Sequence, residues 1–371
     1  MASSVVYFAS VRAEKEEQSL PNKVKRLFNL LEPEKFINKG DLVAIKTHFG
    51  ELGTNAFIKP FFVRKVVDKI IKCGGKPFLT DANTLYSGSR HNAVDHINNA
   101  ILHGFVPGVV NAPVIIADGL TGKDYVRVKI DQKNIKNAHV GSAIHFANAF
   151  IALSHPTGHI GTGYGGALKN IGMGSGNRAG KQAMHSDFKP NINLEKCVGD
   201  GACVRYCPEK AITLVNKKAR VDKEKCIGCA ECVSSCNYDA IKIEWDDPME
   251  RLQEKIVEYV YAVLHEKKEK TGFMNFLTNV TPDCDCPPWS DAYIVNDIGV
   301  LSSHDPVALD QASIDLINAQ PGNPRSKLPR SGQKPGADKF KALEKIDYTL
   351  QLKYAEELGL GTRKYTLKKV K

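Results

Sequence analysis

Short apolar runs that end in polar residues recur along the chain, and they predict the strands of a sheet. Between the first two runs, at 41–48 and 76–83, lies a stretch that repeats apolar side chains with the period of a helix. It covers residues 60–73, and Gly74 with Gly75 ends that helix. A strand–helix–strand order of this kind predicts a right-handed crossover between parallel strands. The runs occupy residues 41–48, 76–83, the VIIADG stretch near 116, and 149–155. The expected fold class is therefore α/β, with a mostly parallel sheet and flanking helices.

Each predicted strand is followed by side chains that can bind a ligand. His48 ends the first run, Asp81 and Asn83 end the second, and His155 ends the last. In open α/β sheets, ligands bind beyond the carboxyl ends of the strands. We expect His48 and His155 to act in catalysis, and Asp81 and Asn83 to contact a substrate. For any single residue, the alternative is an ordinary hydrogen-bonded side chain at a turn.

A glycine-rich stretch, residues 155–185, follows the last of these strands and carries His159, Lys169 and Arg178. Glycine permits close approach of the backbone to a ligand. The stretch matches neither the P-loop nor the dinucleotide fingerprint. We interpret it as a loop around a small ligand, in which His159 supplies protons and Lys169 binds an anion or forms a covalent adduct. Arg178 would bind substrate. The alternative is a linker, which has little use for these side chains.

Ten cysteines occur in the chain, and seven of them lie between Cys197 and Cys236. Residues 226–236 form the run C-x2-C-x2-C-x3-C, and residues 197–208 repeat it with Asp200 in place of the second cysteine. This run holds iron–sulfur clusters, and its fourth cysteine binds the other cluster. The crossed rule assigns Cys197, Asp200, Cys203 and Cys236 to cluster A, and Cys226, Cys229, Cys232 and Cys207 to cluster B. Zinc is the alternative, and the duplicated four-ligand run argues against it.

Asp200 is a harder and weaker iron ligand than a thiolate. Cluster A is therefore expected as [4Fe-4S] with a carboxylate ligand or as [3Fe-4S], whereas cluster B is expected as [4Fe-4S]. Both alternatives for cluster A remain open.

Cys284 and Cys286 form a Cys-x-Cys turn after another apolar run. They suggest a reactive thiol pair or a soft-metal site, and we include them among the substrate-binding candidates. The alternative is two buried small apolar residues.

The α/β pattern resumes after the cysteine-rich stretch, which therefore looks inserted. We expect the first part of an α/β core domain over 1–187, a small α+β ferredoxin-like insert with two clusters over 188–247, and the second part of the core over 248–371.

The insert resembles bacterial two-cluster ferredoxins over residues 191–245. The whole chain resembles a family of iron–sulfur-centre proteins of unknown function, built on a domain of unknown function with such an insert. The segments that carry the likeness include KTHFGELGTNAFIKPFFVRKVVD, GTGYGGALKNIGMG, TPDCDC and DIGVLSSHDPVALDQAS. His159 and Lys169 also resemble the His/Lys pair of lactate-racemase-like nickel-pincer enzymes, in which the lysine tethers the cofactor.

The net charge of +10 favours an acidic redox carrier, such as ferredoxin or flavodoxin, as partner. Lysine and arginine are dispersed along the chain, which argues against nucleic-acid binding. With no signal peptide and no apolar stretch long enough to span a membrane, we expect a cytoplasmic protein of an anaerobic setting.

Three functions remain open. The first is a ferredoxin-dependent oxidoreductase that passes electrons from the insert to a small molecule in the α/β pocket. The second is an electron carrier or assembly partner without catalysis of its own. The third is a non-redox, racemase-like enzyme with structural clusters. The first is preferred because a polar site and a two-cluster segment occur in one chain.

Overall fold

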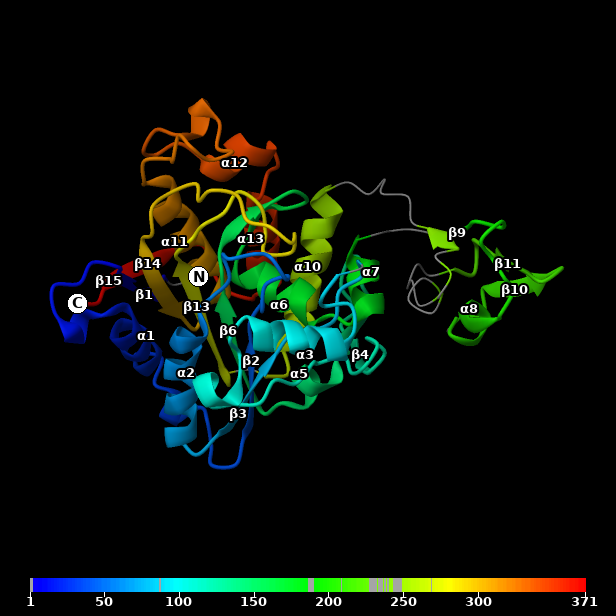
Figure 1. The fold of residues 1–371 in the computed structure, drawn as a ribbon, viewed down its shortest axis with the longest axis horizontal. Coiled ribbons are helices and arrows are strands. Elements are labelled where there is room, and N and C mark those ends of the chain that lie inside the picture. The colour runs from blue at the N-terminus through cyan, green and yellow to red at the C-terminus, as the bar shows by residue number, and fades with distance from the viewer. Residues whose placement is uncertain are drawn as a thin grey trace.

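One seven-stranded sheet organises most of the chain (Figure 1). The computed structural model describes residues 3–86, 88–185, 190–207, 209–226, 232, 236, 238, 240–242, 249–267 and 269–371. The strand order in the sheet is β15–β1–β14–β13–β6–β2–β3. The bounds are β1 Ser4–Ser10, β2 Leu42–Lys46, β3 Lys76–Thr80, β6 Ala149–Ser154, β13 Thr271–Leu277, β14 Gly299–Ser303 and β15 Tyr365–Lys369.

Most neighbouring strands in this sheet are parallel. β3, β2, β6 and β13 pair in parallel one after another, and β15 pairs in parallel with β1. β14 runs antiparallel to both of its neighbours. The predicted α/β fold with a mostly parallel sheet is therefore confirmed, and the predicted crossover joins β2 to β3.

Both faces of the sheet are buried, as parallel sheets require. Along β2, Val43 and Ile45 belong to one core, whereas Ala44 belongs to the other. The first core is covered by α1 (Leu20–Asn29) and α2 (Pro60–Lys72). The second is covered by α6 (Ala167–Ser175), α10 (Met249–Leu264), α11 (Pro306–Asn318) and α13 (Thr349–Glu357). Each fully buried aliphatic side chain contributes roughly 1.5–3 kcal/mol to such a core.

Local signals in the sequence set the ends of the helices. Pro60 opens α2, because proline tolerates the first helical turn. Gly74, with φ of +87°, follows the end of α2 in a conformation that glycine adopts without strain. Asp305 caps α11 by accepting hydrogen bonds from the amides of Val307 and Ala308, each at 2.9 Å.

Smaller elements complete the body. Their bounds are η1 Glu16–Gln18, η2 Pro33–Lys35, α3 Ala93–Leu102, α4 Pro107–Val110, β4 Tyr125–Lys129, β5 Asn137–Gly141, α5 Ser142–Phe146, β7 Thr157–His159, β8 Gly163–Gly165, α7 Arg178–His185, η3 Arg330–Gly332 and α12 Lys339–Glu344. Among the described residues, no helix combines the length and the apolarity needed to cross a membrane.

The stretch near residue 116 differs from its prediction as a full strand. It follows the edge of β3 with a single bridge between Leu79 and Val114. The amides of Ile115 and Ala117 still donate hydrogen bonds to the carbonyls of Leu79 and Asp81. Pro113, which has no N–H, begins the stretch and limits the pairing.

The cysteine-rich stretch forms a small core of its own. Its elements are β9 Asn191–Ile192, α8 Ala202–Arg205, β10 Ile212–Val215, β11 Lys218–Val221 and β12 Ile241–Lys242. β9 pairs with β12, so the beginning and the end of the stretch lie side by side. Figure 1 shows α8 and β9–β11 to one side of the sheet, beyond α7. One contact with the body brings the Lys123 ammonium 4.2 Å from the ring centroid of Tyr206.

Candidate functional site

Polar side chains gather where the parallel strands end. Because β3, β2, β6 and β13 run in the same direction, their carboxyl ends meet at one edge of the sheet. His48, Asp81 and His155 come from the segments just after three of these strands, and the Cys284–Cys286 turn follows the fourth. The strand order thus brings together residues that are far apart in the chain.

A buried charge network lies at the centre of this edge. The Lys46 ammonium is 3.0 Å from one carboxylate oxygen of Asp81, and their side chains are 1% and 3% exposed. The Arg90 guanidinium is 3.5 Å from the other Asp81 oxygen and 3.1 Å from Glu51. Burial opposes ionisation of Asp81, but nearby positive charges, that of Lys46 foremost, outweigh it and lower the pKa. Asp81 is therefore a carboxylate at neutral pH.

The two cysteines of the Cys-x-Cys turn lie beside this network. The sulfur of Cys286 is 3.6 Å from Nε2 of His48. A hydrogen bond from Cys284 lowers the pKa of Cys286, whereas burial raises it. The hydrogen bond with His48 and the charge of Lys169 lower this pKa further. The same hydrogen bond, together with burial, raises the pKa of Cys284. The pair therefore favours one thiolate, on Cys286, beside one thiol.

His155 holds this turn in place. Its Nδ1 lies 2.9 Å from a carboxylate oxygen of Asp285, and its Nε2 lies 2.9 Å from the carbonyl oxygen of Thr278. Both ring nitrogens therefore donate to acceptors, which requires the protonated ring. Burial opposes this charge, but Asp285 outweighs it and raises the pKa of His155. The geometry makes His155 a positioning residue, because neither nitrogen is left to exchange a proton with a substrate.

His159 and Lys169 come from the β7–β8 hairpin and from α6. Nδ1 of His159 accepts hydrogen bonds from the amides of Gly161 and Thr162, both at 3.1 Å. Burial and the charge of Lys169 lower the pKa of His159, so its neutral ring carries the proton on Nε2. Burial opposes the charge of Lys169, but the thiol pair and Asp285 outweigh it and raise its pKa. The pair presents one neutral donor and one cation.

Asn83 and Arg178 lie at a second polar cluster, around Asp118. The backbone and side-chain amides of Asn83 both donate to one oxygen of Asp118 at 2.9 Å. Burial raises the pKa of Asp118 to about 6 and lowers the pKa of Lys181 to about 8. Among the described residues, the buried atoms without a hydrogen-bond partner include Asn83 Oδ1, Asp118 Oδ2 and Arg178 Nε. A polar ligand or water would satisfy these atoms.

The predicted residues of the body thus fall into two neighbouring groups. His48, Lys169, His159 and the two cysteines interact with one another through the sulfur contact and through charge. Asn83 and Arg178 belong to the Asp118 cluster, and Asp81 links the two groups through Lys46 and Lys181. Sequence reasoning missed Lys46, Glu51, Arg90, Lys181 and Asp285. Lys46 ends an apolar run, and this position at a strand end could have identified it as a site residue. Arg90 lies in a polar turn, where no local pattern indicates a site.

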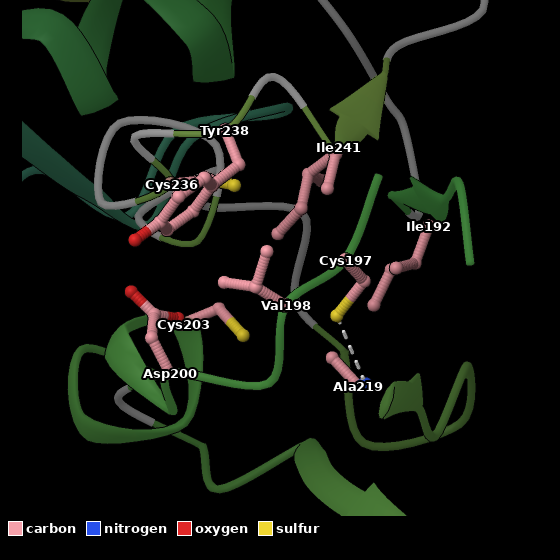
Figure 2. A pocket seen from close by; sticks show the side chains of 10 residues that line it. Ile192, Cys197, Val198, Asp200, Cys203, Ala219, Cys236, Tyr238 and Ile241 are labelled. Atoms are coloured by element: carbon pink, nitrogen blue, oxygen red, sulfur yellow. Dashed lines mark hydrogen bonds between the residues drawn. The ribbon is translucent and has the colours of Figure 1, made fainter. Parts of the chain in front are cut away.

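A separate pocket lies in the cysteine-rich stretch (Figure 2). Cys197, Asp200, Cys203 and Cys236 line one small void that is partly open to solvent. Apolar side chains, among them Val198 and Ile241, complete its wall. The sulfur of Cys197 also accepts a hydrogen bond from the amide of Ala219 at 3.4 Å. The void therefore combines three soft thiol ligands and one harder carboxylate with an apolar surround.

The other predicted ligands are described in part. The sulfur of Cys207 accepts a hydrogen bond from the amide of Ala211 at 3.2 Å. Cys226 and Cys232 are described, whereas Cys229 lies outside the described residues. Within the described part of the chain, no group of three or more His, Cys, Asp or Glu side chains converges closely enough to hold a single metal ion. The ligands of a cluster surround a body of several atoms, so they need not converge on one point.

Comparison with known proteins gives one family match and remote structural likenesses. Lactate racemase apoprotein from Thermoanaerobacterium thermosaccharolyticum is 11% identical with a TM-score of 0.37, covering 74% of this chain and 51% of that one. A Thermotoga maritima protein is 10% identical with a TM-score of 0.31, covering 71% and 52%. The chain thus spans about half the length of these structures. Among curated proteins, none matches.

The family model described as "Domain of unknown function (DUF362)" matches residues 43–315. This range runs from β2 into α11, so it includes the parallel strands, the Cys-x-Cys turn and the cysteine-rich stretch. Because the match covers more than half of the 371 residues, the chain belongs to the DUF362 family.

Proposed function

We propose that this protein is an iron–sulfur oxidoreductase, in which a two-cluster module over 188–247 passes electrons to a small molecule bound at the edge of the sheet. In this proposal the α/β core comprises 1–187 and 248–371. The observation that carries the proposal is the void lined by Cys197, Asp200, Cys203 and Cys236. These are the four residues that the crossed ligand pattern assigns to cluster A.

The residues present fit the two clusters in chemistry. Cysteine thiolates are the ligands of such clusters, and amide hydrogen bonds to their sulfurs tune the reduction potential. Cys197 and Cys207 accept such hydrogen bonds. Cluster A would use the void of Figure 2, and cluster B would use Cys226, Cys229, Cys232 and Cys207. When bound, the clusters supply one-electron transfer.

The edge of the sheet supplies what an electron acceptor needs. Lys169 carries a positive charge that would bind an anionic group, and the neutral His159 ring would donate a hydrogen bond from Nε2. Asn83 Oδ1 and Arg178 Nε are further groups that would bind polar parts of the substrate. This support for a substrate site distinguishes the proposal from a pure electron carrier, which needs no such site.

The net charge of +10 suits an acidic redox carrier as electron donor, because opposite charges speed the encounter. A ferredoxin or flavodoxin has the required chemistry, and weakening of the association by salt would identify the electrostatic contribution.

The first experiment measures iron and its stability. Anaerobically purified protein should hold about seven or eight iron atoms, with electron paramagnetic resonance signals from two clusters. Mild oxidation should remove iron from cluster A first, because the oxygen ligand Asp200 binds iron weakly. Asp200→Cys should make the two clusters similarly resistant.

Asp222→Asn is the matched control, because this exposed carboxylate lies in the same stretch and outside the wall of the void. It should leave iron content and oxidation unchanged. Zinc in place of iron, or one common decay rate that Asp200→Cys does not alter, would contradict the proposal.

A further inference from the structure

The Cys284–Cys286 turn is held from several sides. The carbonyl of Asp285 accepts a hydrogen bond from the amide of Glu51 at 3.0 Å, and its carboxylate faces the His155 ring. Two glycines, Gly158 on β7 and Gly53 in a loop, let neighbouring backbone approach the turn. A Cβ at Gly158 would lie 1.9 Å from the carbonyl oxygen of Pro282, and a Cβ at Gly53 would lie 2.3 Å from that of Pro288. The turn is therefore positioned with little freedom, as a reacting group requires.

The hydrogen bonds of His48 decide which of its nitrogens faces the sulfur as a donor. The amide of Gly50 donates to Nδ1 at 3.0 Å, so Nδ1 is an acceptor. In the neutral ring the proton must then be on Nε2, which lies 3.6 Å from the Cys286 sulfur. A ring that donates to sulfur stabilises a thiolate.

The surroundings of Cys284 differ from those of its neighbour. Its thiol donates to the Cys286 sulfur, and the charge of Lys169 acts on both. Both residues are partly exposed. Two cysteines that served only as small apolar residues would have no use for a histidine donor, a nearby lysine and partial exposure.

We propose that Cys284 and Cys286 form a redox-active dithiol that reduces a small disulfide, with Cys286 as the attacking thiolate and Cys284 as the resolving thiol. Residues two apart along a chain can reach the Cα separation of about 4.4–6.8 Å that a disulfide needs. The source of electrons rests on the proposed function, whereas the thiol chemistry can be tested without it. The inference thus names a substrate class for this site.

The chemistry balances in two exchange steps. The Cys286 thiolate attacks one sulfur of a disulfide R–S–S–R′, the S–S bond breaks, and R′S⁻ leaves and takes a proton from solvent. Cys284 then loses its proton and attacks the Cys286 sulfur, which releases RS⁻ to take that proton. The substrate gains two electrons and two protons, and the pair becomes a disulfide.

Return of the pair to one thiolate and one thiol needs two electrons and one proton. A one-electron donor of the iron–sulfur class would deliver the electrons singly. Lys169 and the His48 ring would stabilise the thiolate that re-forms on Cys286, since both favour its charged state.

The sequence makes the test selective. Trypsin releases residues 271–325 as one peptide, whose two cysteines are Cys284 and Cys286. Full-length protein is treated anaerobically with oxidised glutathione, alkylated, digested with trypsin and analysed by mass spectrometry. The expected peptide carries no alkyl group, and its mass is two hydrogen atoms below that of the same peptide with two free thiols. Cys284→Ser should trap a glutathione adduct on Cys286, whereas Cys286→Ser should trap none. Cys73→Ser is the matched control and should behave as the wild type.

A second readout follows the reactivity of Cys286. At pH 7 its alkylation in His48→Phe should be about tenfold slower, which corresponds to roughly one unit in pKa. The difference in alkylation rate between His48→Phe and the wild type should vanish at a pH well above the ordinary pKa of a thiol. The titratable and charged groups that act on this sulfur are His48, Tyr86, Arg90, His159, Lys169, His185, Cys284 and Asp285.

The outcomes separate this inference from the proposed function. No disulfide and no adduct on this peptide, in protein that holds both clusters, would overturn the dithiol and leave the clusters intact. If protein purified anaerobically holds no iron but still forms the disulfide, the disulfide supports the dithiol and the missing clusters overturn the iron–sulfur source. With both present, photoreduced deazaflavin should reduce the pair in the wild type and not in Cys226→Ser, whereas dithiothreitol should reduce both.

Discussion

At the scale of single residues, the most consequential feature is the buried network of Lys46, Asp81, Arg90 and Glu51. Each charge has an opposite partner within 3.5 Å, which offsets the large cost of removing it from water. Removal of one partner leaves an unpaired buried charge. A single substitution should therefore lower the stability of the fold far more than replacement of both partners together.

We expect Asp81→Asn to lower the free energy of unfolding by about 3–5 kcal/mol, because Lys46 then stays buried without its partner. The double variant Lys46→Met with Asp81→Leu should recover most of this loss. Asp68→Asn is the control: its ion pair with Arg64 is largely exposed, so the change should be about 0.5 kcal/mol or less. Urea unfolding at neutral pH measures all three, and equal losses at Asp81 and Asp68 would contradict the expectation.

The same carboxylate predicts a pH dependence. The folded pKa of Asp81 lies below its unfolded value of 3.8, so its contribution is fully present above about pH 5. Acidification through the unfolded pKa towards the folded one should remove it, because the unfolded state takes up the proton first. In Asp81→Asn the loss of stability below pH 5 should be shallower, and an unchanged acid slope in urea titrations would argue against this role.

At the scale of elements, α6 is positioned by a carboxylate from another helix. Asp310 on α11 accepts hydrogen bonds from the amides of Ala167 and Leu168, at 2.7 and 2.9 Å, in the first turn of α6. Asn275 on β13 also donates to it, at 2.8 Å. A negative group at the N-terminus of a helix satisfies its free amides and its dipole. This contact fixes the helix that carries Lys169.

We expect Asp310→Ala to destabilise the fold by roughly 2–4 kcal/mol, since it leaves several buried donors without an acceptor. Asp310→Asn should cost less because it keeps one carbonyl oxygen. The control is Asp315→Asn on the same helix, where the carboxylate accepts from the exposed Tyr365 hydroxyl. Thermal unfolding followed by circular dichroism measures each, and an Asp310→Ala variant as stable as Asp315→Asn would refute this account of α6.

At the scale of the whole molecule, one sheet uses strands from both sides of the cysteine-rich stretch. β6 precedes the stretch, β13 follows it, and the two pair directly. α7 and α10, the helices that flank the stretch, also pack against each other. The stretch closes on itself through β9 and β12 and has its own core. These contacts support treating it as an insert.

Deletion of residues 188–247, with a short Gly/Ser linker in their place, should therefore leave the α/β core folded. The paired ends make the connection short, and the core loses few of its own contacts. Circular dichroism should retain the helical signal, and unfolding should remain cooperative. The control is a linker replacement of the β10–β11 turn at Asn216 and Lys217, which should leave both parts folded. Loss of helical signal in the deletion alone would mean that the core needs the insert.

Much of the architecture was predictable from local pattern. The runs that became β2, β3 and β6, and the helix between β2 and β3, follow from hydrophobic periodicity and from Pro60 and Gly74 as end signals. The spacing of Cys197, Asp200 and Cys203 predicted ligands of one cluster, which stays a prediction; the three residues do line one pocket, because a short loop brings near neighbours together by chain geometry alone.

The site in the body needed long-range information. His48 and Cys286 are 238 residues apart, and nothing in their local sequences specifies a contact. The order of the strands brings them together, and that order depends on which faces pack best across the whole sheet. Arg90 was missed for the same reason, since its partners Glu51 and Asp81 come from other segments.

Periodicity and spacing act over a few residues, so the sequence is sufficient for the strands, the crossover helix and the cysteine pattern. Protonation states depend instead on neighbours in space. The role of His155 changed from catalytic residue to positioning residue because Asp285 and a backbone carbonyl occupy its two nitrogens. Burial and partners from distant segments, which exist only in the folded chain, set the charge of Asp81, His159 and Lys169.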